Sequence, residues 1–200
     1  MRIAILVEGK TEVAFMPSLR NFLSSRLEHM PRLVPKPYNG RIPKKDKLRR
    51  VVENHLTIDN YDAVMALTDV YTGTKDFKDA EDAKKQMREW VGDNPKFYPH
   101  AAPYDFEAWL LPFWSTIQKR AKHNKSAPGG NPEQVNHDNP PSKRIKEIYE
   151  LGKSPKSYDK AIEAPKILEQ NNLMVSVKAC PELKAFINTI LMLCESELIP

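Results

Sequence analysis

The sequence predicts an α/β protein in which a parallel sheet of about four strands is flanked by helices and followed by a helical C-terminal extension. Through the first half of the chain, short apolar runs alternate with longer stretches of helical periodicity, whereas the second half contains only helical patterns and loops. Alternation of this kind is typical of a parallel sheet with helices on both sides. We therefore expect an α/β core over residues 1–120, and a loop with packed helices over residues 121–200.

Four segments have the character of strands. Residues 3–7 and 63–67 are continuous apolar runs, which is the pattern of a strand that is buried on both faces. Residues 32–38 and 96–102 contain prolines, which cannot donate a hydrogen bond to a sheet ladder. We therefore expect the first two strands at the centre of the sheet and the other two at its edges.

Apolar residues at helical spacing fill the intervals between these strands. They predict helices over residues 11–27, 44–57 and 79–91. Pro17 falls within the first two turns of the first of them, where a proline costs least although a kink is possible. The second half predicts further helices over residues 106–119, 142–151, 158–170 and 181–195. A loop rich in Pro, Gly and Asn separates the first of these from the rest, over residues 124–141.

Basic residues outnumber acidic ones and give a formal net charge of +5. They are concentrated between Arg32 and Arg50, and again near residue 143. Such a distribution suits the backbone of a nucleic acid, DNA more than RNA, or is an ordinary solvated surface. The residues that we expect to contact phosphate are Lys10, Arg41, Lys44, Lys45, Lys47, Lys143 and Arg144.

The sequence contains no apolar run near the roughly 20 residues that span a bilayer, and its first residues do not form a signal peptide. A cytoplasmic protein without a membrane partner is therefore expected. Cys180 and Cys194 lie in a helical stretch, about 20 Å apart if the helix is continuous. This separation is too large for a disulfide, so free thiols are expected.

Two of the predicted strands end in an acidic residue. Glu8 follows residues 3–7 directly, and Asp69 comes two residues after residues 63–67. The carboxyl ends of parallel strands meet at one edge of a sheet, where open α/β folds bind their ligands. Carboxylates suit a hard cation, so the pair predicts an Mg²⁺ or Mn²⁺ site. The alternative is that both acids are capping or loop carboxylates.

Residues 7–12, Val-Glu-Gly-Lys-Thr-Glu, resemble the opening of Toprim domains, which occur in topoisomerases, primases and overcoming-lysogenization-defect (OLD) nucleases. That resemblance implies a metal site formed by the glutamate and a later Asp-x-Asp pair. Here the pair is represented by Asp69 and Tyr71, so the second aspartate is missing. The wider pattern, which includes Phe106-Glu107-Ala108-Trp109 and Lys178-Ala179-Cys180-Pro181, is similar to a Toprim-like prokaryotic family of unassigned function. Members of that family are often encoded beside AAA or ABC-type ATPases.

A third metal ligand is needed in place of Tyr71. Asp76 is the first candidate, so the expected metal ligands are Glu8, Asp69 and Asp76, and the expected catalytic residues are Glu8, Asp69 and Glu107. Asp105 is a further candidate. Asp105 and Glu107 are also suited to capping the helix that follows them.

Three functional hypotheses follow. The resemblance implies a metal-dependent phosphodiesterase, in particular a nuclease that acts with an ATPase partner in defence against phage or other foreign DNA. The missing aspartate favours a non-catalytic Toprim-like subunit that regulates or binds an ATPase complex. A phosphoryl-transfer enzyme for a small nucleotide is the third, although an extended basic stretch is not needed for so small a substrate. The sequence has no Walker A, GxGxxG or HExxH pattern, so we do not expect this chain to hydrolyse ATP alone.

Overall fold

Four parallel strands form a single sheet in the computed structural model, which describes residues 1–70, 76–135, 138–152 and 157–200. The strands are β1 (Arg2–Val7), β2 (Arg32–Pro37), β3 (Ala63–Val70) and β4 (Phe97–Pro103). Their order across the sheet is β2-β1-β3-β4. The two apolar strands are therefore central and the two proline-containing strands are at the edges, as predicted.

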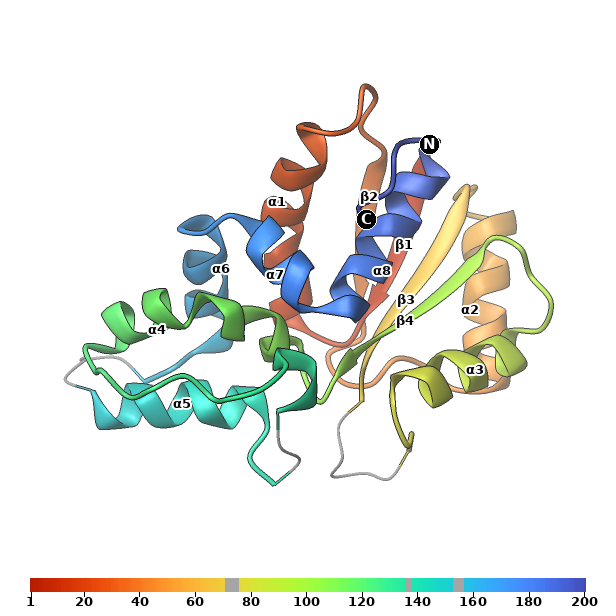
Figure 1. Cartoon of the computed structure of the whole chain (residues 1–200). Coiled ribbons are helices and arrows are strands. Elements are labelled where there is room, and N and C mark those ends of the chain that lie inside the picture. Colours follow the sequence, from red (N-terminus) through yellow and green to blue (C-terminus); the bar gives the residue numbers. More distant parts are fainter. Residues whose placement is uncertain (71–75, 136–137, 153–156) are drawn as a thin grey trace.

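The register of the sheet brings the ends of the two central strands together. Val7 of β1 pairs with Leu67 of β3, so Glu8 lies level with the residues that end β3. On the other side of β3, Asp69 pairs with Ala102 of β4. The carboxyl ends of all four strands point to the lower edge of the sheet in Figure 1.

Helices cover both faces of the sheet (Figure 1). Helices α2 (Asp46–Thr57) and α3 (Ala80–Val91) pack on the face that carries Ala4 and Leu6. The opposite face carries Ile3 and Ile5. The elements packed against it are α1 (Lys10–Ser24), η1 (Phe106–Phe113) and α8 (Pro181–Leu193), and α6 (Lys160–Glu169) and α7 (Leu173–Ala179) pack in turn on α1 and η1.

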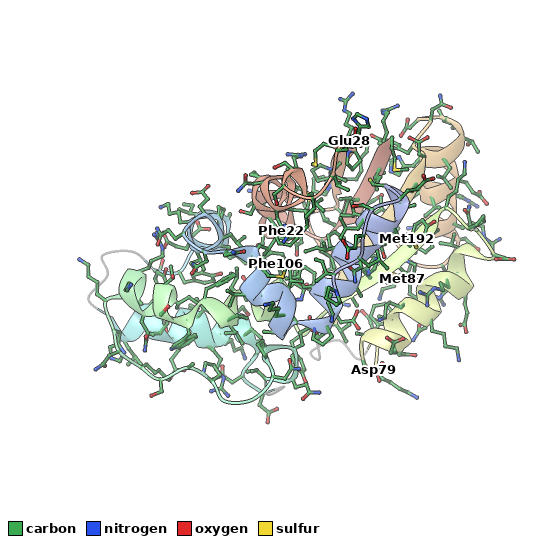
Figure 2. The ribbon with its side chains drawn as sticks, turned by 45° about the horizontal axis from the view of Figure 1, so that its top comes forward. Phe22, Glu28, Asp79, Met87, Phe106 and Met192 are labelled. Atoms are coloured by element: carbon green, nitrogen blue, oxygen red, sulfur yellow. The ribbon has the colours of Figure 1, made fainter. Side chains whose placement is uncertain are left out.

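The second of these layers has a continuous apolar core that joins the two halves of the chain. Phe106, labelled in Figure 2, lies inside this core, with its ring centroid 5.3 Å from those of Phe15 and Trp109. Phe186 of α8 is also fully buried and packs against Trp109. Helices from the C-terminal half therefore complete the core on this face of the sheet. In the described ranges, no helix is long and apolar enough to cross a membrane.

The segment after β4 differs from the prediction of one α-helix over residues 106–119. The structure has a 3₁₀ helix, η1, and then α4 (Trp114–Ala121). Pro112 explains the break, because a proline lacks the N–H of a helical hydrogen bond and its ring clashes with the preceding turn. Trp109, Phe113 and Trp114 are buried in the core.

The remaining helices agree with the prediction except for α7 and the short η2 (Pro132–Gln134), which lies within the predicted loop. Helix α5 (Pro141–Leu151) and η2 lie beside η1, and α6 and α8 are close to their expected ranges. Helix α7 was not predicted, although the Asn172 side chain caps its start by accepting from the backbone N–H of Met174. Cys180, between α7 and α8, and Cys194, after α8, are both free, as expected.

Candidate functional site

Glu8 and Asp69 meet at the carboxyl edge of the sheet. Oε1 of Glu8 accepts hydrogen bonds from the hydroxyl of Thr68 and, at 3.3 Å, from the backbone N–H of Asp69. Burial raises the pKa of Glu8 above its ordinary value, and the hydrogen bond from Thr68 and the charge of Arg41 oppose that rise. The parallel register thus brings the two predicted acids together.

Glu12 joins them from the first turn of α1. Its side chain is buried, and Oε2 accepts from the backbone N–H of Gly9 at 3.0 Å. This bond is half of a capping arrangement that fixes the glutamate at the start of the helix. Glu12 raises the pKa of both Asp69 and Glu8 through its negative charge, so its carboxylate lies near theirs.

Asp105 and Glu107 reach the same place from the turn between β4 and η1. Tyr104 makes this turn with a φ of 67°, a left-handed conformation that is uncommon for a bulky residue and is found at functional sites. Asp105 precedes η1, where a capping residue was expected, but its Oδ2 accepts from the backbone N–H of Ser142 in α5 at 3.2 Å. Glu107 is fully buried, and its Oε1 accepts from the hydroxyl of Tyr158 at 3.3 Å.

Two carboxylate oxygens in this group have no hydrogen-bond partner although they are buried. They are Oδ1 of Asp105 and Oε2 of Glu107. Burial, followed by the negative charge of Asp105, raises the pKa of Glu107 to about 8. Buried polar atoms without partners are rare in folded proteins, and each calls for an explanation such as a bound ion.

We refer to these acids together as the acidic cluster. Its members are Glu8, Glu12, Asp69, Asp105 and Glu107. The pKa of Asp69 is well above its ordinary value, chiefly because of burial and then because of the other four carboxylates. One basic side chain from the C-terminal half approaches the cluster. Lys160, at the start of α6, has a raised pKa, mainly because of the charge of Glu107.

The donor chemistry of the acidic cluster fits a hard cation. Every side chain in it offers carboxylate oxygens, which are the ligands that Mg²⁺ and Mn²⁺ prefer. As the side chains stand, however, no group of three or more His, Cys, Asp or Glu residues in the described ranges is arranged to hold a metal ion. Metal binding would therefore require some of these carboxylates to turn toward a common point.

Asp76, the predicted third ligand, is paired with basic residues. Its Oδ2 lies 2.6 Å from Nη1 of Arg41 and 2.7 Å from Nζ of Lys44. The role of Asp76 as a metal ligand stays a prediction. To bind a metal, its carboxylate would have to leave Arg41 and Lys44. Tyr71 lies outside the described residues.

The other predicted phosphate contacts are distributed around the same edge of the sheet. Lys10 begins α1 and is exposed, and Lys45 and Lys47 are exposed at the start of α2. Lys143 and Arg144 lie in the first turn of α5, beside the Ser142 amide that binds Asp105. These positions are compatible with a polyanion that passes along the edge. The spacing of residues in the sequence did not point to Tyr158 or Lys160, which lie just before and at the start of the distant helix α6.

His100 is not part of this site. It lies within β4 opposite Leu67, and its ring packs edge-on against Phe186 of α8 with 5.4 Å between centroids. Burial lowers its pKa to about 3, helped by the nearby charges of Lys84 and Arg88.

The chain belongs to the family described as a domain of unknown function (DUF4276), which matches residues 7–191. The match includes all members of the acidic cluster. Comparisons with curated proteins and with solved structures found no significant match.

Proposed function

We propose that this protein is a metal-dependent phosphodiesterase, in particular a nuclease, that uses Mg²⁺ or Mn²⁺. The observation that carries the proposal is the convergence of buried and half-buried carboxylates at the carboxyl edge of the sheet, with two buried oxygens that lack hydrogen-bond partners. Open α/β sheets bind their ligands at this edge. Groups that are buried, charged and incompletely paired are more typical of functional sites than of structural ones.

In this proposal, Glu8 and Asp69 hold the metal from the ends of β1 and β3, with Asp76, Glu107 or Asp105 as the further ligand. A divalent ion at such a site supplies charge stabilisation for a phosphoryl group and activates water. Where Asp76 or Asp105 supplies the further ligand, Glu107 is the proposed catalytic acid–base residue, since burial and the charge of Asp105 raise its pKa to about 8. Tyr158 donates to Glu107 and fixes the orientation of its carboxyl group.

The basic residues around the edge supply the proposed contacts to the nucleic-acid backbone. Arg41 and Lys44 are next to the acidic cluster, and Lys143 is at the start of α5. Contacts of this kind carry no sequence information but provide salt-dependent affinity. DNA is the preferred substrate in this proposal. A Toprim-like relationship, an AAA or ABC-type ATPase partner, a cytoplasmic location and a role in defence against foreign DNA remain proposals that rest on the sequence resemblance.

Calorimetric titration with Mg²⁺ and Mn²⁺ tests the metal site first. We expect saturable binding to the parent protein and its loss in Glu8→Gln and Asp69→Asn. The matched control is Asp93→Asn, which removes an exposed carboxylate from the turn between α3 and β4. A DNA cleavage assay of the same four proteins follows, with and without the neighbouring ATPase. Cleavage by Glu8→Gln and Asp69→Asn at the parent's rate would rule out the proposed chemistry.

The second candidate function is a non-catalytic subunit that binds or regulates an ATPase. Two observations favour it: Tyr71 replaces the second aspartate of the Toprim pair, and the described carboxylates do not form a ready set of three ligands. In that case Lys160 would serve as the permanent counter-charge of the cluster. Co-purification with the ATPase, without metal binding or cleavage by the complex, would favour this function.

A further inference from the structure

We propose that Arg41 and Lys44 form a binding site for a phosphate group, and that the carboxylate of Asp76 occupies this site until a substrate phosphate displaces it. The inference deepens the proposed function, on which it rests, by naming where the phosphate beside the scissile bond is held. We call the two basic residues the anion site.

The anion site has the chemistry that a phosphate requires. One oxygen of Asp76 lies within 2.7 Å of both Arg41 Nη1 and Lys44 Nζ, so a single negatively charged oxygen already bridges the two cations. A guanidinium and an ammonium together carry more N–H donors than one carboxylate oxygen accepts. A phosphate offers several oxygens and a larger negative charge, so it satisfies these donors better than the carboxylate does.

Buried neighbours hold all three side chains in place. Ile42 is 4% exposed and anchors the backbone next to Arg41, while Leu48 is fully buried in the first turn of α2, which follows Lys44 and Lys45. Phe77 is 8% exposed and packs against Trp90 of α3, which fixes the backbone next to Asp76. The side chains of Arg41 and Asp76 are themselves 28% and 27% exposed. The pair is therefore partly buried and preorganised, unlike a pair of freely moving surface residues.

The anion site lies beside the acidic cluster. The chain between β2 and α2 crosses the end of β1, because the backbone N–H of Gly40 donates to the carbonyl of Glu8 at 2.8 Å. Arg41 follows directly, and its charge opposes the rise that burial causes in the pKa of Glu8. A nucleic-acid strand could then place one phosphate between Arg41 and Lys44 while an adjacent phosphodiester reaches the cation that we propose at Glu8 and Asp69.

Binding of a fluorescent single-stranded DNA oligonucleotide in EDTA tests the anion site without metal or cleavage. We expect Asp76→Asn to bind about three- to tenfold more tightly than the parent, because it removes one like charge next to the bound phosphate. Asp93→Asn changes the net charge equally at a remote exposed position and should change the affinity far less. Adding Arg41→Gln to Asp76→Asn should abolish the gain. Equal affinities for Asp76→Asn and Asp93→Asn would overturn the proposal.

A measurement on the unmodified protein keeps the test decisive if Asp76→Asn does not fold. Acylation of lysine amines, read by mass spectrometry, should be slower at Lys44 when the oligonucleotide is bound. Lys85, exposed on α3, is the internal control and should react equally in both states. Unchanged reactivity of Lys44 at saturating oligonucleotide would reject the anion site. Because both experiments are done in EDTA, they can succeed even when metal binding or cleavage fails.

Discussion

Replacement of Glu107 by glutamine changes the charge of the acidic cluster while keeping its shape. The side chain is fully buried, one of its oxygens accepts from Tyr158, and the other has no partner. Glutamine is nearly the same size and is neutral at every pH. The variant Glu107→Gln therefore separates the effect of ionisation from the effect of packing.

The pKa of Glu107 sets the size of the expected effect. Burial and the charge of Asp105 raise it from 4.5 to about 8 in the folded protein, whereas the carboxyl of the unfolded chain ionises near 4.5. Between these values the folded state holds a proton that the unfolded state has released, so the free energy of unfolding decreases as the pH rises. The contribution of Glu107 is fully present below pH 4.5 and is lost by about pH 8. At about 1.4 kcal/mol per pH unit, the total loss is about 3–5 kcal/mol.

Thermal unfolding in EDTA at about pH 5 and about pH 9 measures this loss. A chain of this size changes its melting temperature by about 2–4 °C per kcal/mol. We therefore expect the parent to melt at least about 6 °C lower at the higher pH, and Glu107→Gln to show a smaller difference, to which Asp69 and Asp105 still contribute. Glu53→Gln, which neutralises an exposed glutamate of α2, is the matched control and should behave like the parent.

The result that would refute this reasoning is a Glu107→Gln protein that loses as much stability with rising pH as the parent does. In that case Glu107 would be ionised in the folded state near its ordinary pKa, with solvent or Lys160 stabilising its charge. A parent protein whose stability does not fall with rising pH would have the same meaning for the whole acidic cluster, since burial raises the pKa of Asp69 and Asp105 in the same direction.

Three further predictions test other parts of the structure. Mg²⁺ at about 100 times its Kd should raise the free energy of unfolding of the parent, measured with denaturant, by about 3 kcal/mol. The same addition should leave the free energies of unfolding of Glu8→Gln and Asp69→Asn unchanged. Equal stabilisation of all three proteins would contradict a metal at these acids. Lys44→Gln should reduce the slope of log Kd against log salt for DNA by about one, and an unchanged slope would exclude a phosphate contact. Glu133→Ala should lower the free energy of unfolding, measured with urea, by about 2–4 kcal/mol. The reason is that Glu133 accepts hydrogen bonds from Trp109 Nε1 at 2.8 Å and from the first backbone amides of α8. A loss below about 1 kcal/mol would mean that water takes the place of the Glu133 carboxylate in these hydrogen bonds.

The sheet and the meeting of its two acids could be predicted because they depend on local patterns. Continuous apolar runs identified β1 and β3 as central, and the prolines of β2 and β4 excluded those strands from the interior. Once two strands are parallel neighbours, residues just beyond their ends must lie together, which brings Glu8 beside Asp69. The α/β class and the four-stranded parallel sheet are confirmed on this basis.

The remainder of the candidate site depends on contacts that sequence spacing does not record. Tyr158 and Lys160 come from the start of α6, and only the packing of the C-terminal helices on α1 and η1 brings them to Glu107. Asp76 could be assigned to the site region but not to a partner, because a residue in a loop is free to turn toward acids or toward bases. The 3₁₀ form of η1 was not predicted, because the apolar residues of 106–119 are typical of one helix and the effect of Pro112 was not taken into account.

The distribution of charge at the carboxyl edge argues for a site that handles a cation and an anion side by side. An acidic cluster alone would repel a phosphate. The nearby basic residues do not supply hydrogen bonds to the two buried carboxylate oxygens that lack partners. The charge of Arg41 opposes the rise in the pKa of Glu8, and Arg41 also forms an ion pair with Asp76. The basic residues therefore interact with the acidic cluster through their charges. Opposite charges arranged purely for stability would be expected to pair directly, as Arg120 and Glu163 do at 2.7 Å elsewhere in the molecule. In the acidic cluster, Glu107 and Asp105 instead keep an unpartnered oxygen each, and this supports our proposal that a cation binds there beside a phosphate.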